Sequence, residues 1–327
     1  WGPAMGREAS RNRADADRAR CSAWDGHSMG SSPALIRASE LADRCVGRAA
    51  KVIEAGWGGW THPWGSVLDS IPGTVVLDTD LLESGWPDWR LLPVETLQKV
   101  LGSLGVDSAD PIVVSSTRAT AAARLAWVLL VSGAHEVMVL DGGSRAWKSA
   151  RRSMLWPEPH RSSEFVAQPR STWVADNDWL ATRLGRPDVR IADVRSLAEY
   201  EGRTSGYRTL EAKGRIPGSI WMGDADDSNP IYVRADGTLH DPFEAEQMWL
   251  KLGLARDDDC ETVFVCGGGW RASLAWLYAR LAGWEQVRVL ADGWSGWSTE
   301  FVADAEAGGT TPGWRQVPTS LPRVVLG

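Results

Sequence analysis

The chain repeats itself: the segments 112–147 and 262–297 superimpose at an offset of 150 residues without a gap. Each segment has the pattern of a β-branched strand, a turn, a helix, a second strand and a Gly-rich turn. The strand residues are nearly all apolar, which is typical of a parallel sheet that is covered on both faces. The repeat therefore predicts two α/β units in tandem, each a mainly parallel sheet flanked by helices.

The repeat continues upstream of these segments. A strand that ends in an acid precedes each of them, with Glu54 in the first unit and Asp193 in the second. An Ile-Pro-Gly turn follows each strand, and it is reproducible because Pro fixes φ and Gly permits a tight bend. The predicted boundaries are a disordered tail at 1–32, a first unit at 33–150, a linker at 151–171, a second unit at 172–300 and a C-terminal tail at 301–327.

Composition narrows the classes of function. The net charge of -7 argues against a non-specific nucleic-acid binder, which needs clustered cationic charge. No apolar run reaches about 18 residues, so no membrane span is expected, and residues 1–32 lack the apolar core of a secretory signal. The cysteines form neither a CxxC pair nor a metal-ligand pattern, so we expect free thiols, a reducing cytoplasmic compartment and no metal; they are Cys21, Cys45, Cys260 and Cys266.

One loop of the second unit has the composition of an anion-binding site. An apolar strand is followed by Cys266, the glycines 267–269 and a helix that begins near Arg271. Glycines let successive backbone N–H groups point into one concavity, and a helix N-terminus adds about half a positive charge. We therefore expect Cys266 to be held largely as a thiolate and to act as a nucleophile. The alternative is a buried structural cysteine at the end of a strand.

The spacing between Cys266 and Arg271 distinguishes among cysteine chemistries. Cysteine phosphatases need five residues between the cysteine and the arginine, whereas this chain has four. A tighter loop suits a single sulfur atom on the cysteine better than a tetrahedral phosphate. We therefore favour sulfur chemistry, and a phosphatase or arsenate reductase is the less favoured alternative.

These motifs together resemble the rhodanese superfamily, and specifically its tandem-domain sulfurtransferases. The Cys-Gly-x-Gly-Trp-Arg loop is similar to that of a bacterial branch of multidomain members. The resemblance implies that Cys266 takes sulfur from a small anionic donor as a persulfide and passes it to a thiol, to cyanide or to a protein cysteine, without a cofactor. It covers about residues 33–300 and rests on the loop 266–271, on Asp193-Val-Arg195, and on the segments 214–221 and 292–297.

The usual family plan pairs a non-catalytic first domain with a catalytic second one. The resemblance implies the same plan here, because Ser116 stands at the position that matches Cys266. The Cys-Gly-x-Gly loop resembles the 3-mercaptopyruvate class, whereas thiosulfate enzymes tend to carry basic loop residues. The chain departs from the mercaptopyruvate pattern at Gly268, Glu54 and Glu201, so the donor stays open between the two compounds. The alternative is a rhodanese fold that binds a partner or delivers sulfur to it without turnover.

The resemblance also implies roles for individual residues. Cys266 is the catalytic nucleophile, and Arg271 holds the donor's anionic group or braces the loop. Asp193 and Arg195 support the loop as a buried pair, and Glu54 is a candidate for proton transfer across the domain interface. The expected substrate-binding residues are Gly267, Gly268, Gly269, Trp270, Arg203 and Arg208.

Overall fold

The structure is a computed structural model, and it describes several separate segments of the chain. The predicted N-terminal tail falls almost wholly outside these segments, as do the first half of the linker, 151–162, and most of the C-terminal tail. The described residues are 32–43, 50–56, 71, 73–85, 90–150, 163–208, 210–302 and 315–316.

The first domain contains a five-stranded parallel sheet with the strand order β1-β5-β4-β2-β3. Its central strand β4 is buried from Ile112 to Ser115, as expected of a strand that is covered on both faces. The strands are β1 (Ala34–Ile36), β2 (Lys51–Gly56), β3 (Val75–Asp78), β4 (Pro111–Ser115) and β5 (Glu136–Leu140).

The second domain repeats this sheet, with five parallel strands in the equivalent order β6-β10-β9-β7-β8. The shared order confirms the prediction of two tandem α/β units. A short antiparallel pair, β11 and β12, lies after the second sheet in the chain. The strands are β6 (Val174–Ala175), β7 (Val189–Asp193), β8 (Ile220–Trp221), β9 (Glu261–Val265), β10 (Val287–Leu290), β11 (Phe301–Val302) and β12 (Arg315–Gln316).

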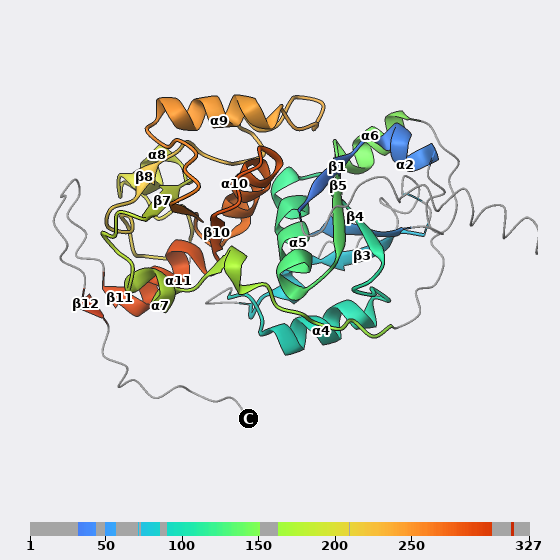
Figure 1. Ribbon diagram of the computed structural model, residues 1–327, viewed down its shortest axis with the longest axis horizontal. Coiled ribbons are helices and arrows are strands. Elements are labelled where there is room, and N and C mark those ends of the chain that lie inside the picture. Colours follow the sequence, from blue (N-terminus) through green and yellow to red (C-terminus); the bar gives the residue numbers. More distant parts are fainter. Residues whose placement is uncertain are drawn as a thin grey trace, which may run out of the picture.

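Helices cover both faces of each sheet (Figure 1). Within the described residues, no helix is long and apolar enough to cross a membrane. The first domain holds α2 (Ala38–Asp43), the 3-10 helix η2 (Thr79–Leu82), α4 (Val94–Ser103), α5 (Ala119–Ser132) and α6 (Gly143–Ser149). The rest of the chain holds the 3-10 helix η3 (Ser171–Trp173), α7 (Asn177–Ala181), α8 (Leu197–Tyr200), α9 (Pro242–Lys251), α10 (Trp270–Leu281) and α11 (Gly293–Glu300).

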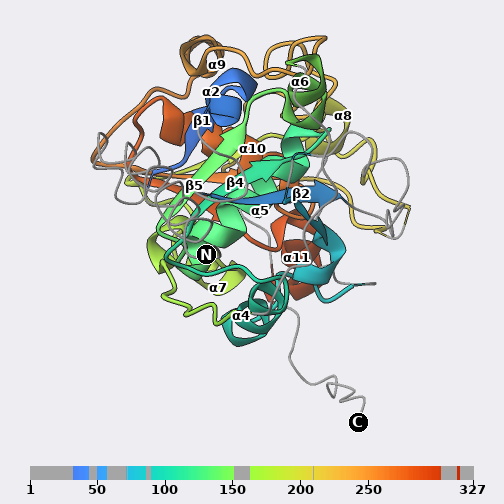
Figure 2. The same ribbon diagram turned by 90° about the vertical axis from the view of Figure 1, so that its right-hand side faces the viewer.

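One apolar core is shared by the two domains, because α5 and α10 pack side by side between the sheets (Figures 1 and 2). Helix α5 is buried on all sides, which explains why its sequence is apolar on every face apart from Arg124 and small hydroxyl residues. Val114 and Phe264 point from the two sheets into this shared core. Their neighbours Val113 and Val263 point to the opposite faces, which α2 and α6 cover in the first domain and α7 and α11 cover in the second.

A polar contact between the domains lies at the N-terminus of α5. The carboxylate of Asp227, from the second domain, accepts hydrogen bonds from the Thr120 N–H at 2.9 Å and the Thr120 hydroxyl at 2.6 Å. It also pairs with the Arg118 Nε at 2.8 Å. Helix α5 has no capping side chain of its own at Arg118. Asp227 therefore caps the helix from the other domain, where its negative charge also complements the helix dipole.

We expect Asp227→Ala to weaken the docking of the two domains, because it removes this cap and an ion pair. The free energy of unfolding should fall by about 1–2 kcal/mol, as measured by urea denaturation. Asp258→Ala is the matched control, because Asp258 belongs to an exposed ion pair with Arg256 that contributes little. Equal stabilities of the two variants would contradict the role of Asp227.

Candidate active site

Cys266 lies directly after β9, at the C-terminal edge of the second sheet, and is buried with 1% of its surface exposed. The loop turns back on itself, so that the N–H of Gly269 donates to the Cys266 Sγ at 3.1 Å. Helix α10 begins at the next residue, Trp270. The sulfur is therefore held by a backbone donor at the N-terminus of a helix, a position that favours negative charge.

The Gly-rich turn before α11 supports the loop from behind. Gly293 has a φ of 57°, and a Cβ there would lie 2.6 Å from the carbonyl oxygens of Cys266 and Gly267. The first N–H groups of α11 then donate to these carbonyls, from Trp294 to Cys266 at 2.7 Å and from Ser295 to Gly267 at 2.9 Å. Gly293 of the Asp-Gly-Trp motif is thus a requirement of the loop, because only glycine permits this close approach.

Arg271 is braced by two carboxylates. Its guanidinium forms a bidentate pair with Glu199 at 2.8 and 2.9 Å and a further pair with Asp224 at 3.0 Å. Burial lowers the pKa of Arg271, but the groups that face it, chiefly Tyr207 and Glu199, raise it by more, so the guanidinium stays charged. Of the two roles expected for Arg271, the geometry therefore favours bracing of the loop.

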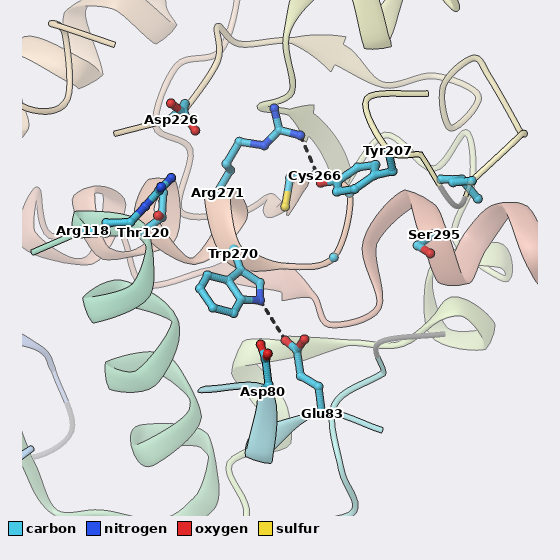
Figure 3. Close-up of a pocket in the computed structure, with 13 residues that line it drawn as sticks. Asp80, Glu83, Arg118, Thr120, Tyr207, Asp226, Cys266, Trp270, Arg271 and Ser295 are labelled. Atoms are coloured by element: carbon cyan, nitrogen blue, oxygen red, sulfur yellow. Dashed lines mark hydrogen bonds between the residues drawn. The ribbon is translucent and has the colours of Figure 1, made fainter. Parts of the chain in front are cut away.

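Tyr207 covers the loop, and no sequence motif pointed to it. Although the residue as a whole is 41% exposed, its hydroxyl accepts a hydrogen bond from the Arg271 Nη2 at 3.3 Å. A Cβ at Gly267 would lie 1.9 Å from this hydroxyl, which explains the glycine there. Burial raises the pKa of Tyr207 to about 12, so the phenol stays protonated through the neutral range. Figure 3 shows the phenol beside Cys266.

The loop opens into a pocket of about 360 Å³ that lies between the domains (Figure 3). This volume suits a small-molecule ligand. The second domain lines it with residues 266–268, Trp270, Arg271, Tyr207, Leu210, Asp226 and Ser295. The first domain contributes Asp80, Glu83, Arg118 and Thr120.

Glu83 connects the first domain to the loop. One carboxylate oxygen accepts from the Trp270 Nε1 at 2.9 Å and from the Arg124 Nη2 at 3.1 Å. Burial raises the pKa of Glu83, and the charge of Arg124 and the two hydrogen bonds oppose part of the rise. Arg124 is fully buried and lies against Gly269. Glu83 and Arg124 of the first domain thus hold in place Trp270 and the backbone of Gly269, which donates to the sulfur.

The predicted support pair lies beneath the loop, away from the pocket. Asp193 and Arg195 are fully buried and joined at 2.6 Å, and Arg195 also donates to the Gly214 carbonyl at 2.8 Å. The ring of Trp294 lies against the Arg195 guanidinium at 5.1 Å. These contacts tie the end of β7 to the turn before β8 and to α11, as expected of a structural pair.

Four other predicted residues do not line the pocket. Gly269 donates to the Cys266 sulfur but is not a lining residue. Arg203 is exposed and paired with Glu201 at 2.7 Å, and Arg208 is exposed on the same surface stretch. Glu54 lies on β2, where burial raises its pKa and the neighbouring Ser115 and Ser144 oppose part of the rise. Within the described residues, no group of three or more His, Cys, Asp or Glu side chains is arranged to hold a metal ion.

Comparison with known sequences places this site in a family. A family model described as "Rhodanese-like domain" matches residues 176–300. Thiosulfate sulfurtransferase YnjE of Escherichia coli is 32% identical over 76% of this chain. Thiosulfate sulfurtransferase of Azotobacter vinelandii is 31% identical over 69% of this chain and 82% of that protein. The rat 3-mercaptopyruvate sulfurtransferase is 26% identical over 69% of this chain and 76% of that protein.

Solved structures also superimpose on this chain. The crystal structure of YnjE superimposes with a TM-score of 0.68 at 29% identity, over 81% of this chain and 66% of that one. An EanB variant, with a cysteine persulfide in a tetrahedral intermediate state with ergothioneine, gives a TM-score of 0.72 at 28% identity, over 81% and 68%. The chain therefore belongs to the rhodanese superfamily. It spans 58% of the length of the E. coli relative.

The glycines of the loop differ in what they permit, and this difference is testable. Gly269 has a φ of 88°, and a Cβ there would lie 2.4 Å from the Arg124 Nη1 and 2.7 Å from the Ala291 carbonyl. Gly269→Ala should therefore cost at least about 1 kcal/mol of unfolding free energy and abolish the reactivity of Cys266. Gly268→Ala is the control, because its Cβ would meet nothing within 4 Å. Loss of reactivity in both variants would show that the packing against Arg124 is not what the site needs.

Proposed function

We propose that this chain is a sulfurtransferase, which moves a sulfane sulfur from thiosulfate or 3-mercaptopyruvate to a thiophilic acceptor through a persulfide on Cys266. The observation that carries the proposal is the position of the Cys266 thiol. It receives a backbone N–H at the N-terminus of α10 and opens into a pocket between the domains. The names of the relatives support both donors.

In the first step the Cys266 thiolate attacks the outer sulfur of the donor. With thiosulfate the S–S bond breaks and sulfite leaves with the electron pair. With 3-mercaptopyruvate the C–S bond breaks, and the carbanion of pyruvate takes a proton from solvent. In both cases the new bond joins the donated sulfur to Cys266, and no oxidant is needed. This is covalent catalysis in two half-reactions, so we expect ping-pong kinetics.

In the second step the acceptor attacks the outer sulfur of the persulfide, and Cys266 leaves as a thiolate. Negative charge lies on sulfur at the start and at the end of both half-reactions. The Gly269 N–H and the N-terminus of α10 are fixed before either step, so they stabilise that charge without rearrangement. Because two carboxylates already neutralise Arg271, we infer that it holds the loop and leaves the donor's charge to the backbone.

We propose that the first domain is non-catalytic and completes the pocket. Ser116, which matches Cys266 in the repeat, donates its hydroxyl to the Ala55 carbonyl at 2.7 Å and accepts from the Arg118 N–H at 3.2 Å. A hydroxyl does not form a nucleophilic anion as easily as a thiol does. The N-terminus of α5, where a donor would have to bind, holds the carboxylate of Asp227.

Intact-mass measurement tests the sulfurtransferase proposal. After incubation with thiosulfate or with 3-mercaptopyruvate, the protein should gain the mass of one sulfur atom. Cys266→Ser should lose this gain, and Cys260→Ser should keep it because Cys260 lies outside the pocket. Steady-state kinetics with each donor then assign the substrate, with cyanide, thiols and hercynine as acceptors, since EanB is seen with hercynine. If neither donor produces an adduct, the proposal is refuted and a binding role without turnover is favoured.

Tyr207→Phe should slow persulfide formation about tenfold while leaving the fold intact, because the hydroxyl next to Arg271 and the reacting sulfur is lost. The raised pKa of Tyr207 means that its proton is present below about pH 12. The ratio of wild-type to variant rates should therefore stay constant from pH 6 to about pH 9. A ratio that changes across this range would show that the phenol itself titrates there. Single-turnover rates at each pH make the measurement.

A further inference from the structure

The charges around the pocket select among sulfur acceptors. We propose that the site favours a small acceptor that carries a positive charge close to its reactive sulfur, of the aminothiol class. This inference rests on the proposed sulfurtransferase function, because it names the substrate class of the second half-reaction. It follows from the ion pairs of the lining residues, from the position of Asp226 and from the indole ring of Trp270.

The two arginines that line the pocket are already paired with carboxylates. Arg118 pairs with Asp227 at 2.8 Å, and Arg271 pairs with both Glu199 and Asp224. The lining Glu83 has its own cation, the buried Arg124. The lining and its ion-pair partners thus hold three guanidinium groups, Arg118, Arg124 and Arg271, against five carboxylates, Glu83, Glu199, Asp224, Asp226 and Asp227, without counting Asp80. Away from the backbone donors that face the Cys266 sulfur, a ligand in the pocket therefore meets an excess of negative side-chain charge.

Asp226 is the carboxylate of this group that lines the pocket without an arginine partner among the described ion pairs. Its Oδ1 accepts from the N–H and the hydroxyl of Ser228 at 3.0 and 2.8 Å. Burial raises the pKa of Asp226, but these hydrogen bonds, together with the charges of Arg271 and Arg118, lower it by more, so the net shift is downward. A lowered pKa keeps the carboxylate ionised at neutral pH. Figure 3 shows Asp226 on the side of the pocket where Arg271 and Arg118 lie.

Trp270 provides an aromatic surface close to the nucleophile. Its Nε1 donates a hydrogen bond to the Glu83 carboxylate at 2.9 Å, which holds the ring between that carboxylate and Cys266 (Figure 3). The face of an indole ring attracts a cation within about 6 Å of its centre, and the attraction is stronger where water is excluded. A positively charged group that enters the pocket therefore has both a carboxylate and an aromatic ring to contact.

The chemistry of the second step makes this charge useful. The acceptor attacks as a thiolate, which is an anion, and the outer sulfur of the persulfide is anionic as well. An ammonium group on the acceptor makes the attacking species a zwitterion with no net charge. The S–S bond then breaks toward Cys266, which leaves as a thiolate, while the acceptor keeps the outer sulfur. An anionic acceptor, by contrast, brings a second negative charge into a negative pocket.

Charged thiol reagents test the field without any sulfur donor. We would treat the full chain with 2-aminoethyl methanethiosulfonate, a cation, and with 2-sulfonatoethyl methanethiosulfonate, an anion, and follow labelling of Cys266 by peptide mass. Each rate is divided by the rate of the same reagent with 2-mercaptoethanol. The cationic reagent should label Cys266 at least about tenfold faster at low ionic strength, and added salt should reduce the ratio.

Two matched variants show whether the lining acid is responsible. Asp226→Asn should lower the cation-to-anion ratio several-fold. Asp236→Asn is the control, because Asp236 makes the same kind of turn, with the Thr238 N–H at 2.9 Å and hydroxyl at 2.7 Å, but does not line the pocket. A ratio near one in the wild type, or an equal ratio in Asp226→Asn and the wild type, would overturn the proposal.

The acceptors themselves complete the test on the preformed persulfide. Cysteamine, 2-mercaptoethanol and 3-mercaptopropionate differ mainly in charge, and we expect transfer rates per thiolate to fall in that order. Asp226→Asn should narrow the spread. If no persulfide forms with either donor, the proposed function fails, yet the labelling ratio still decides the charge preference of the pocket. If the persulfide forms but 3-mercaptopropionate reacts fastest, only the charge preference fails.

Discussion

The close approach of neighbouring backbone to the loop 266–269 is the constraint on which the site depends. Gly293 brings α11 against the loop carbonyls from behind, and Arg124 lies against Gly269 from the first domain. Between these contacts the Gly269 N–H donates to the sulfur of Cys266. A side chain at Gly269 or Gly293 would separate these surfaces, so the glycines are required by packing as much as by the chemistry of the loop.

The two central helices show how one structural element serves two purposes. Helices α5 and α10 follow equivalent strands and present equivalent N-termini, each of which favours negative charge. At α10 the negative group is the sulfur of Cys266, which faces a pocket. At α5 it is the carboxylate of Asp227, which joins the domains. Both halves of the repeat thus bind a negative group at the N-terminus of the central helix. In the second domain this group is the candidate nucleophile, and in the first it is a carboxylate that joins the domains.

The site relies on backbone donors for its chemistry and uses its side-chain charges for positioning. Arg271 is held by Glu199 and Asp224, and Arg124 is held by Glu83. Both arginines are buried where an unpaired cation would be costly, so the carboxylates are needed for the fold to accept them. The carboxylates around the pocket outnumber these guanidinium groups, so its electrostatics differ from those of a site that binds anions through free arginines.

The sequence by itself determined the two parallel units, the position of Cys266 after an apolar strand and the glycine loop. Each of these follows from local periodicity or from short-range backbone geometry, which a sequence displays directly. Only the tertiary structure decided which distant residues meet Cys266. Glu83 and Tyr207 line the pocket, whereas Arg203, Arg208 and Glu54 do not. Their positions depend on how the shared core docks the two domains and on the direction in which each side chain then points, and neither is encoded in the spacing of residues along the chain.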